Sequence, residues 1–156
     1  MPKLSCWFLK TSLLYFLAGT TLGAFMLLGK GIGYIPFQGI LLEDHMELLL
    51  IGWVFQFVFG IGFWIFPRAD KKRKYELSAW LSFYFFNAGL ILFLTGAPLA
   101  QMVFHGHSAS LISSVFRFLP LAGESLVVLG LIFFIFPIWV RVQGISQVLE
   151  KYREKG

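Results

Sequence analysis

Charged residues are scarce in this sequence of 156 residues, and cysteine is almost absent. Asp, Glu, Lys and Arg make up 13% of the chain, about half of the share usual in soluble globular proteins. Hydrophobic residues reach 58% and include 19 phenylalanines, more than a water-soluble fold of this length could bury. The single cysteine, Cys6, excludes an intrachain disulfide and any Cys-x-x-Cys metal or redox motif. The composition therefore predicts an integral membrane protein.

Motifs of nucleotide and hydrolase chemistry are missing as well. The sequence contains no Walker loop, no dinucleotide-binding glycine fingerprint, no Gly-x-Ser-x-Gly and no His-Glu-x-x-His. Apolar and polar residues do not alternate over the ten-residue stretches typical of a transmembrane β-barrel. We therefore expect an all-α membrane protein without nucleotide-dependent or hydrolytic activity.

Four apolar stretches are long enough to cross a bilayer, for which a helix needs about 20 residues. They cover roughly 11–28, 45–66, 77–100 and 111–140. The last stretch is long enough to be tilted, or to begin with an interfacial turn before Pro120. The predicted fold is one domain over 1–156, an up-and-down bundle of four transmembrane helices.

Lysine and arginine are distributed unevenly among the connections between these stretches. Eleven of the 13 fall in the N-terminal segment, in the connection at 68–74 or in the C-terminal tail. The opposite side carries only Lys30 and Arg117. By the positive-inside rule, both termini are predicted to be cytoplasmic. The basic run at 68–74 is interpreted as a stop-transfer and lipid-headgroup feature, so membrane lipids are expected partners and nucleic acid is not.

Three polar residues lie near the centres of different spans: Gln56, Asn87 and Glu124. Because lipid offers them no hydrogen-bond partner, we expect them to face one another at one depth. They would serve either as interhelical hydrogen bonds or as a proton or quinone-headgroup site with Glu124 as the titrating group. Arg117 precedes Glu124 by seven residues on the same helical face, so it either approaches Glu124 or extends outward to the interface.

His45 opens the second span on its outer side, among acidic residues. At α-helical spacing, Gly52 and Gln56 return to within 20° of His45 and share its face. A histidine above a glycine on an otherwise aromatic face leaves a slot where a flat macrocycle could approach the backbone. The alternative is a histidine at headgroup level that is hydrogen-bonded to a carboxylate.

Two further patterns are less specific. His105 and His107 lie in the connection between the third and fourth spans, on the same side as His45. Together the three histidines could bind copper or zinc, although unrelated histidines in a solvated loop would look the same. Gly19-x-x-x-Gly23 in the first span has the spacing of close helix packing.

The second span also carries a family resemblance. Its segments DHMELLLIGW (44–53) and FGIGFWIFPR (59–68) combine a histidine, a Gly/Trp-rich middle, an aromatic pair and a closing proline. They resemble the second transmembrane helix of the large subunit of heme-copper oxidases, closest to the nitric oxide reductase branch. In that family the helix runs from outside to inside, and its histidine is an axial ligand of the low-spin heme. The resemblance implies that His45 binds heme b, with Gly52 and Gln56 beside it.

The resemblance covers about 25 residues. The family's second heme ligand and its catalytic metal ligands lie in later helices that have no counterpart here, so the chain is not a complete oxygen or nitric oxide reductase. It is similar to short four-span proteins described as oxidase-subunit-I-like. This implies a heme-binding or accessory component of a respiratory chain, in a bacterial or archaeal cytoplasmic membrane.

Other functions and partners remain open at this point. His105, His107, a symmetry-related His45 or another subunit would supply the second axial ligand, so a homo-oligomer or respiratory complex subunits are expected partners. The alternatives are a structural or assembly subunit without a cofactor, and a metal-handling membrane protein that uses the outer histidines.

Overall fold

The computed structural model describes residues 1–33, 38–66, 76–104, 111–142 and 153. Its elements in chain order are α1 (Lys3–Ile32), α2 (Gln38–Glu47), the π-helix η1 (Leu48–Phe55), α3 (Gln56–Ile65), α4 (Glu76–Phe104) and α5 (Leu111–Arg141). No β-strand occurs in these ranges. The all-α class is thus confirmed.

Four helical segments are long and apolar enough to span a membrane: Lys3–Ile32, Gly39–Ile65, Glu76–Gly96 and Phe118–Trp139. The second of them is one continuous helix made of α2, η1 and α3. The four predicted apolar helices are therefore confirmed, and they indicate an integral membrane protein. The first helix begins at Lys3 rather than near Thr11, because helical backbone continues beyond the purely apolar stretch. It ends where Gly33 adopts a left-handed conformation with φ of 77°.

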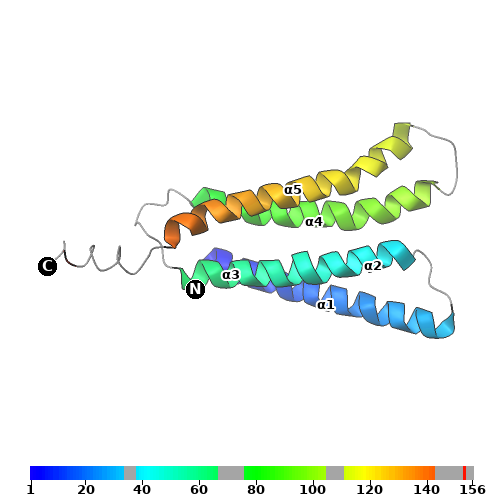
Figure 1. Ribbon diagram of the computed structural model, residues 1–156, viewed down its shortest axis with the longest axis horizontal. Coiled ribbons are helices and arrows are strands. Elements are labelled where there is room, and N and C mark those ends of the chain that lie inside the picture. The colour runs from blue at the N-terminus through cyan, green and yellow to red at the C-terminus, as the bar shows by residue number, and fades with distance from the viewer. Residues whose placement is uncertain (34–37, 67–75, 105–110, 143–152, 154–156) are drawn as a thin grey trace.

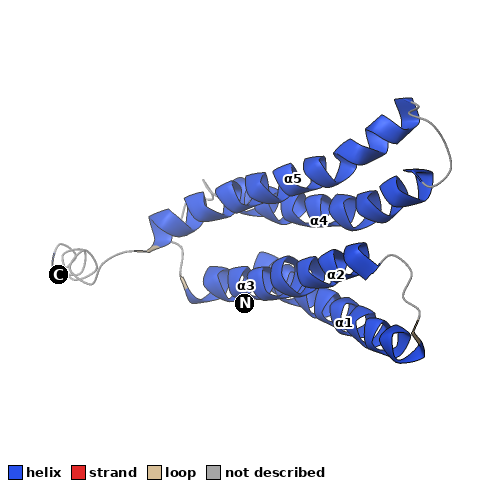
Figure 2. Ribbon diagram, turned by 45° about the vertical axis from the view of Figure 1, so that its right-hand side comes forward, coloured by secondary structure: helices blue, strands red, loops and turns tan. Residues whose placement is uncertain are grey.

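The helices form two antiparallel hairpins that lie side by side (Figures 1 and 2). α1 pairs with α2, η1 and α3, and α4 pairs with α5. The α4–α5 pair is especially close because glycines meet across it. A Cβ atom on Gly89 would lie 2.6 Å from the carbonyl oxygen of Gly123, and one on Gly130 would lie 2.9 Å from the amide nitrogen of Phe86.

An aromatic cluster joins the two hairpins in the half of the bundle nearer the N-terminus. Phe8 is fully buried, and its ring meets that of Phe83 edge-on with centroids 5.0 Å apart. Phe59 stacks on Phe134 with a centroid distance of 3.7 Å. These contacts connect α1 to α4 and α3 to α5, so they hold the hairpins together by ring packing.

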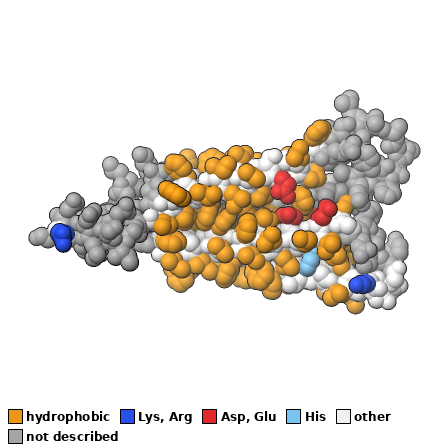
Figure 3. Space-filling model, in the orientation of Figure 1, with side chains coloured by type: hydrophobic (Ala, Val, Ile, Leu, Met, Phe, Trp, Pro, Cys, Tyr) orange, Lys and Arg blue, Asp and Glu red, His pale blue; other side chains and the backbone are white. Residues whose placement is uncertain are grey.

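Outward-facing side chains on the membrane-spanning helices are mostly apolar. Figure 3 shows hydrophobic side chains covering the middle of one face of the molecule. In lipid such a surface is at no disadvantage, since the acyl chains are as apolar as leucine. The polar and charged side chains of these helices are therefore the candidates for a functional site.

Candidate functional site

His45, on α2, points toward α1. Its Nδ1 atom lies 2.8 Å from the carbonyl oxygen of Gly19. A carbonyl only accepts hydrogen bonds, so Nδ1 is the donor, and in the neutral imidazole this leaves the lone pair on Nε2. The imidazole ring lies against Gly23, where a Cβ atom would stand 2.7 Å from Cε1. The Gly19/Gly23 pair therefore makes room for the histidine ring as well as for close helix packing.

A groove with a volume of about 610 Å³ runs between α1 and α2 beside this ring. Seven residues line it besides His45: Thr20, Gly23, Ala24, Met26, Leu27, Lys30 and Leu42. Most of these side chains are apolar, and Lys30 is the one charged group among them. The groove is thus an apolar space with a histidine on its wall and a cation within it.

Gly52 and Gln56 do not share this groove. A Cβ atom on Gly52 would lie 2.8 Å from Cβ of Tyr15 and 3.1 Å from Cδ2 of Leu90, so the space beside the glycine is filled. Gln56 is fully buried between α1 and α4. The space expected beside Gly52 is therefore occupied by side chains of α1 and α4, and cofactor binding by Gly52 and Gln56 stays a prediction.

The backbone between these residues is not a regular α-helix. η1 (Leu48–Phe55) is π-helical, with hydrogen bonds from each residue to the fifth one along. Its turns hold more residues than those of an α-helix, so the spacing of 100° per residue does not carry across it. His45 and Gln56 nevertheless both face α1, where His45 meets Gly19 and Gln56 meets Thr11. The space between them is closed by Tyr15 and Leu90, which pack against Gly52.

Gln56 belongs to a polar network in the bundle interior. Its Nε2 donates to Oδ1 of Asn87 at 3.2 Å, and Thr11 donates its hydroxyl to Oε1 of Gln56 at 2.8 Å. The Tyr15 hydroxyl also donates to Oδ1 of Asn87, at 3.0 Å. Nδ2 of Asn87 in turn donates to the carbonyl oxygen of Phe83 at 2.8 Å. These four side chains connect α1, α3 and α4 by hydrogen bonds within an apolar surrounding.

Two of these residues, Thr11 and Tyr15, were not singled out in the sequence. Their spacing of four residues places both on one face of the first span, which is the pattern that could have identified them. Hydroxyl groups in a membrane helix usually bond to their own backbone, so neither residue is conspicuous in a sequence. The Thr11 hydroxyl in fact bonds both to Gln56 and to its own helix, where the carbonyl oxygen of Trp7 lies 2.8 Å away.

Glu124 is not part of the network. No hydrogen bond joins it to Gln56 or Asn87, both of which lie in the described part of the chain. Its carboxylate lies close enough to that of Glu47 for the two charges to interact. Glu124 follows Gly123, whose backbone packs against Gly89, so Glu124 is not far from Asn87 along the bundle but faces another neighbour.

Acidic side chains gather in the half of the bundle that contains His45, over α2 and α5 (Figure 3). Asp44 is only 6% exposed, and its Oδ1 has no hydrogen-bond partner among the residues described. It interacts electrostatically with Glu43 and Glu47. The histidine bonded to a carboxylate, which we considered as an alternative, is not found, since His45 bonds to the backbone of α1 instead.

The remaining candidates lie where the structure gives no side-chain geometry. His105 and His107 are outside the described residues, and so is the side chain of Arg117. Within the described ranges, no group of three or more His, Cys, Asp or Glu residues could hold a metal ion. A copper or zinc site at His45, His105 and His107 therefore stays a prediction.

Comparison of the chain with protein-family models, with curated proteins and with solved structures finds no match. One imidazole with a fixed proton position, an apolar groove beside it and a nearby cation could hold a flat cofactor that has a metal centre and acidic substituents. The polar network, by contrast, consists of groups that do not titrate near neutral pH and is suited to holding helices together.

Proposed function

We propose that this chain is a membrane-embedded heme-binding protein in which His45 supplies an axial ligand to heme b. The observation that carries the proposal is the 2.8 Å contact between Nδ1 of His45 and the Gly19 carbonyl. Histidines that ligate metals commonly donate their other ring N–H to a backbone carbonyl or carboxylate, which fixes the tautomer and orients the ring. The resemblance of the second span to the oxidase large subunit points to the same residue.

The surroundings of His45 suit the cofactor. The groove beside the ring is large and mainly apolar, as a porphyrin requires, and it has a cation, Lys30, to pair with a heme propionate. Heme placed here would lie between α1 and α2 at the flank of the bundle, not in its interior. When bound it would supply one-electron transfer.

A second axial ligand would come from His105 or His107, from His45 of a second copy, or from another subunit. The proposed role is accordingly that of an accessory or electron-transfer component of a respiratory chain, either as a homo-oligomer or in complex with respiratory subunits. We place it in a bacterial or archaeal cytoplasmic membrane with both termini in the cytoplasm, as its lysines and arginines favour.

A cofactor-free structural or assembly subunit is the second candidate. It is favoured by the filled space at Gly52, where Tyr15 and Leu90 pack tightly, and by the satisfied Nδ1 of His45. In that case the histidine would serve only to fasten α2 to α1. The two candidates differ in one respect that can be measured, namely whether Nε2 of His45 binds iron.

The test is a heme titration of the protein in lipid nanodiscs, compared with the variant His45→Gln. Glutamine keeps an amide donor for the Gly19 carbonyl but provides no imidazole for iron, so the helix contact survives while ligation is lost. We expect a Soret band that saturates with the wild type and fails to develop with His45→Gln, at equal helical content by circular dichroism. A folded wild type that takes up no heme, or a variant that takes it up equally well, would exclude His45 as the ligand.

A further inference from the structure

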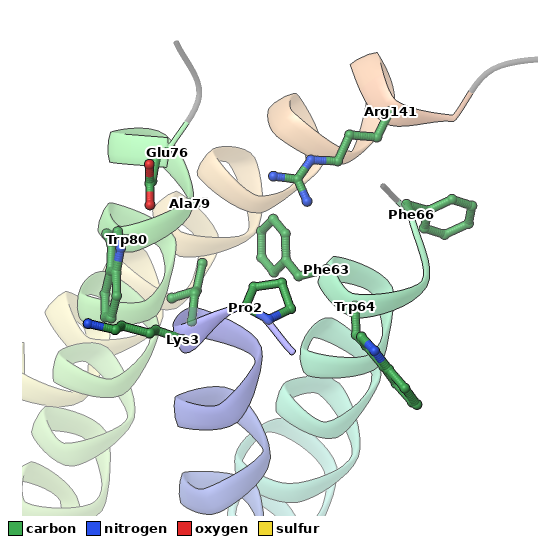
Figure 4. Close-up of a pocket in the computed structure, with 10 residues that line it drawn as sticks. Pro2, Lys3, Phe63, Trp64, Phe66, Glu76, Ala79, Trp80 and Arg141 are labelled. Carbon is green, nitrogen blue, oxygen red and sulfur yellow. The ribbon is translucent and has the colours of Figure 1, made fainter. Parts of the chain in front are cut away.

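A cavity with a volume of about 260 Å³ lies at the opposite end of the bundle from His45. All four membrane-spanning segments contribute to it, because α1 and α4 begin there and α3 and α5 end there (Figure 4). Its lining residues are Pro2, Lys3, Leu4, Phe63, Trp64, Phe66, Glu76, Ala79, Trp80 and Arg141. The positive-inside rule predicts this end to be cytoplasmic.

The charged side chains of the cavity have an excess of positive charge. Among the lining residues that the structure describes, the two cations Lys3 and Arg141 face one acid, Glu76. The guanidinium carbon of Arg141 lies over the Phe63 ring, 5.0 Å from its centroid, which is within the range of a cation–π contact. A guanidinium carries its N–H groups in its own plane, in a fork that matches phosphate oxygens.

The start of α1 adds further positive potential. Pro2 is its N-cap, no side chain caps the helix, and its first turn contains no acid. The first amide groups of such a helix have no partner within it, and they point toward the positive end of the helix dipole. Ser5, in the same turn, is fully buried, and its hydroxyl has no hydrogen-bond partner among the described residues. Pro2, Lys3 and Leu4 place this uncapped end at the cavity wall.

The aromatic residues fix the depth of the cavity in the membrane. Trp64 and Trp80 lie on opposite sides of it (Figure 4). The apolar segment of the second span ends at Ile65, and that of the third begins at Glu76. Tryptophan at the end of an apolar span is typical of the interface where lipid headgroups lie. The cavity is therefore at headgroup level.

We propose that this cavity binds the phosphate of an anionic phospholipid, with Arg141, Lys3 and the first turn of α1 as its donors. Basic pockets between transmembrane helices at the cytoplasmic side are suited to such headgroups. The volume corresponds to about nine waters at ~30 Å³ each, enough for a phosphate and the first atoms of its glycerol. Because all four spans line the cavity, the lipid would connect the two hairpins at this end. The proposal is independent of heme binding.

The test is native mass spectrometry of the full chain released from nanodiscs that contain equal amounts of phosphatidylglycerol and phosphatidylcholine. We expect the wild type to retain phosphatidylglycerol preferentially, and the variants Arg141→Gln and Lys3→Gln each to lose about tenfold of that preference, since each removes a charge-assisted hydrogen bond. Lys10→Gln is the matched control, because Lys10 is an exposed lysine of α1 that does not line the cavity.

Two further arms separate the possible outcomes. Arg141→Lys keeps the charge and should retain part of the preference, which guards against a variant that merely fails to fold. Inorganic phosphate in excess should not displace the lipid, because the acyl chains hold it at the site. Equal retention of both lipids by the wild type, equal loss in Lys10→Gln, or displacement by free phosphate would each overturn the proposal.

Discussion

Replacing Gly123 by alanine tests the close contact of α4 with α5. The new Cβ atom would lie 2.7 Å from both the carbonyl oxygen of Gly89 and the amide nitrogen of Phe93. Ordinary contact begins near 3.4 Å, so the two helices would have to separate by about 0.7 Å. The atoms in the way belong to the backbone, which cannot turn aside as the end of a side chain can.

The expected loss of stability follows from two opposing effects. Overpacking of a close-packed contact costs about 1–3 kcal/mol. Alanine is favoured over glycine in a helix by about 0.5–1 kcal/mol, which offsets part of this. We therefore expect Gly123→Ala to lower the free energy of unfolding by about 1–2 kcal/mol.

Gly62→Ala is the matched control. Its Cβ atom would meet only the ends of Phe134 and Ile138, at 3.8 and 3.9 Å, so the helix-forming tendency of alanine acts alone. This variant should be more stable than the wild type by about 0.5 kcal/mol. Unfolding by SDS in mixed micelles, followed by tryptophan fluorescence, measures both. If Gly123→Ala proved as stable as Gly62→Ala, the backbone contact between α4 and α5 would be refuted.

Three other predictions address the topology, the polar network and the histidine groove. Reporter fusions at 68–74 and after the last residue should read cytoplasmic, as the distribution of lysine and arginine requires; an external reading at either site contradicts the predicted orientation. A double-mutant cycle with Gln56→Leu and Asn87→Leu should give a coupling of about 0.6–1.7 kcal/mol in the free energy of unfolding, whereas additive effects would mean that their hydrogen bonds add nothing. Gly23→Val should abolish heme uptake in the nanodisc titration by displacing the His45 ring, while Gly31→Val, at a position with nothing within 4 Å, should leave it unchanged. Equal uptake by these two variants would argue against a heme in the groove.

Hydropathy was sufficient to predict the four helices, because a bilayer demands about 20 apolar residues from each span. It could not predict their contacts. Glycines seven residues apart, Gly89 and Gly96 on α4 and Gly123 and Gly130 on α5, return to one helical face and mark the seam between these helices. This spacing can be recognised in the sequence, but many glycines in membrane helices are not at a helix–helix contact. Only the structure shows which of them meet.

The site was predictable in its residues but not in its geometry. His45 stands out as an ionisable residue in an apolar span, and Gln56 and Asn87 stand out as buried amides. The side chains of Tyr15 and Leu90 fill the space beside Gly52, and no spacing in the second span could predict this. Nothing in the apolar run Leu48–Phe55 distinguishes the π-helical turns of η1 from α-helical turns either. That Glu124 has no hydrogen bond to Gln56 or Asn87 could not be predicted, because the depth of a residue in its span does not determine which neighbour its side chain faces.

The most direct test of the central proposal is a reduced-minus-oxidised absorption spectrum of the full chain, purified in mild detergent from heme-replete membranes. We predict a Soret band in the purified protein and a sharp α-band on reduction, both absent from His45→Gln prepared in parallel. A folded wild-type protein without a Soret band, even after incubation with heme, would contradict the assignment of His45 as an axial ligand.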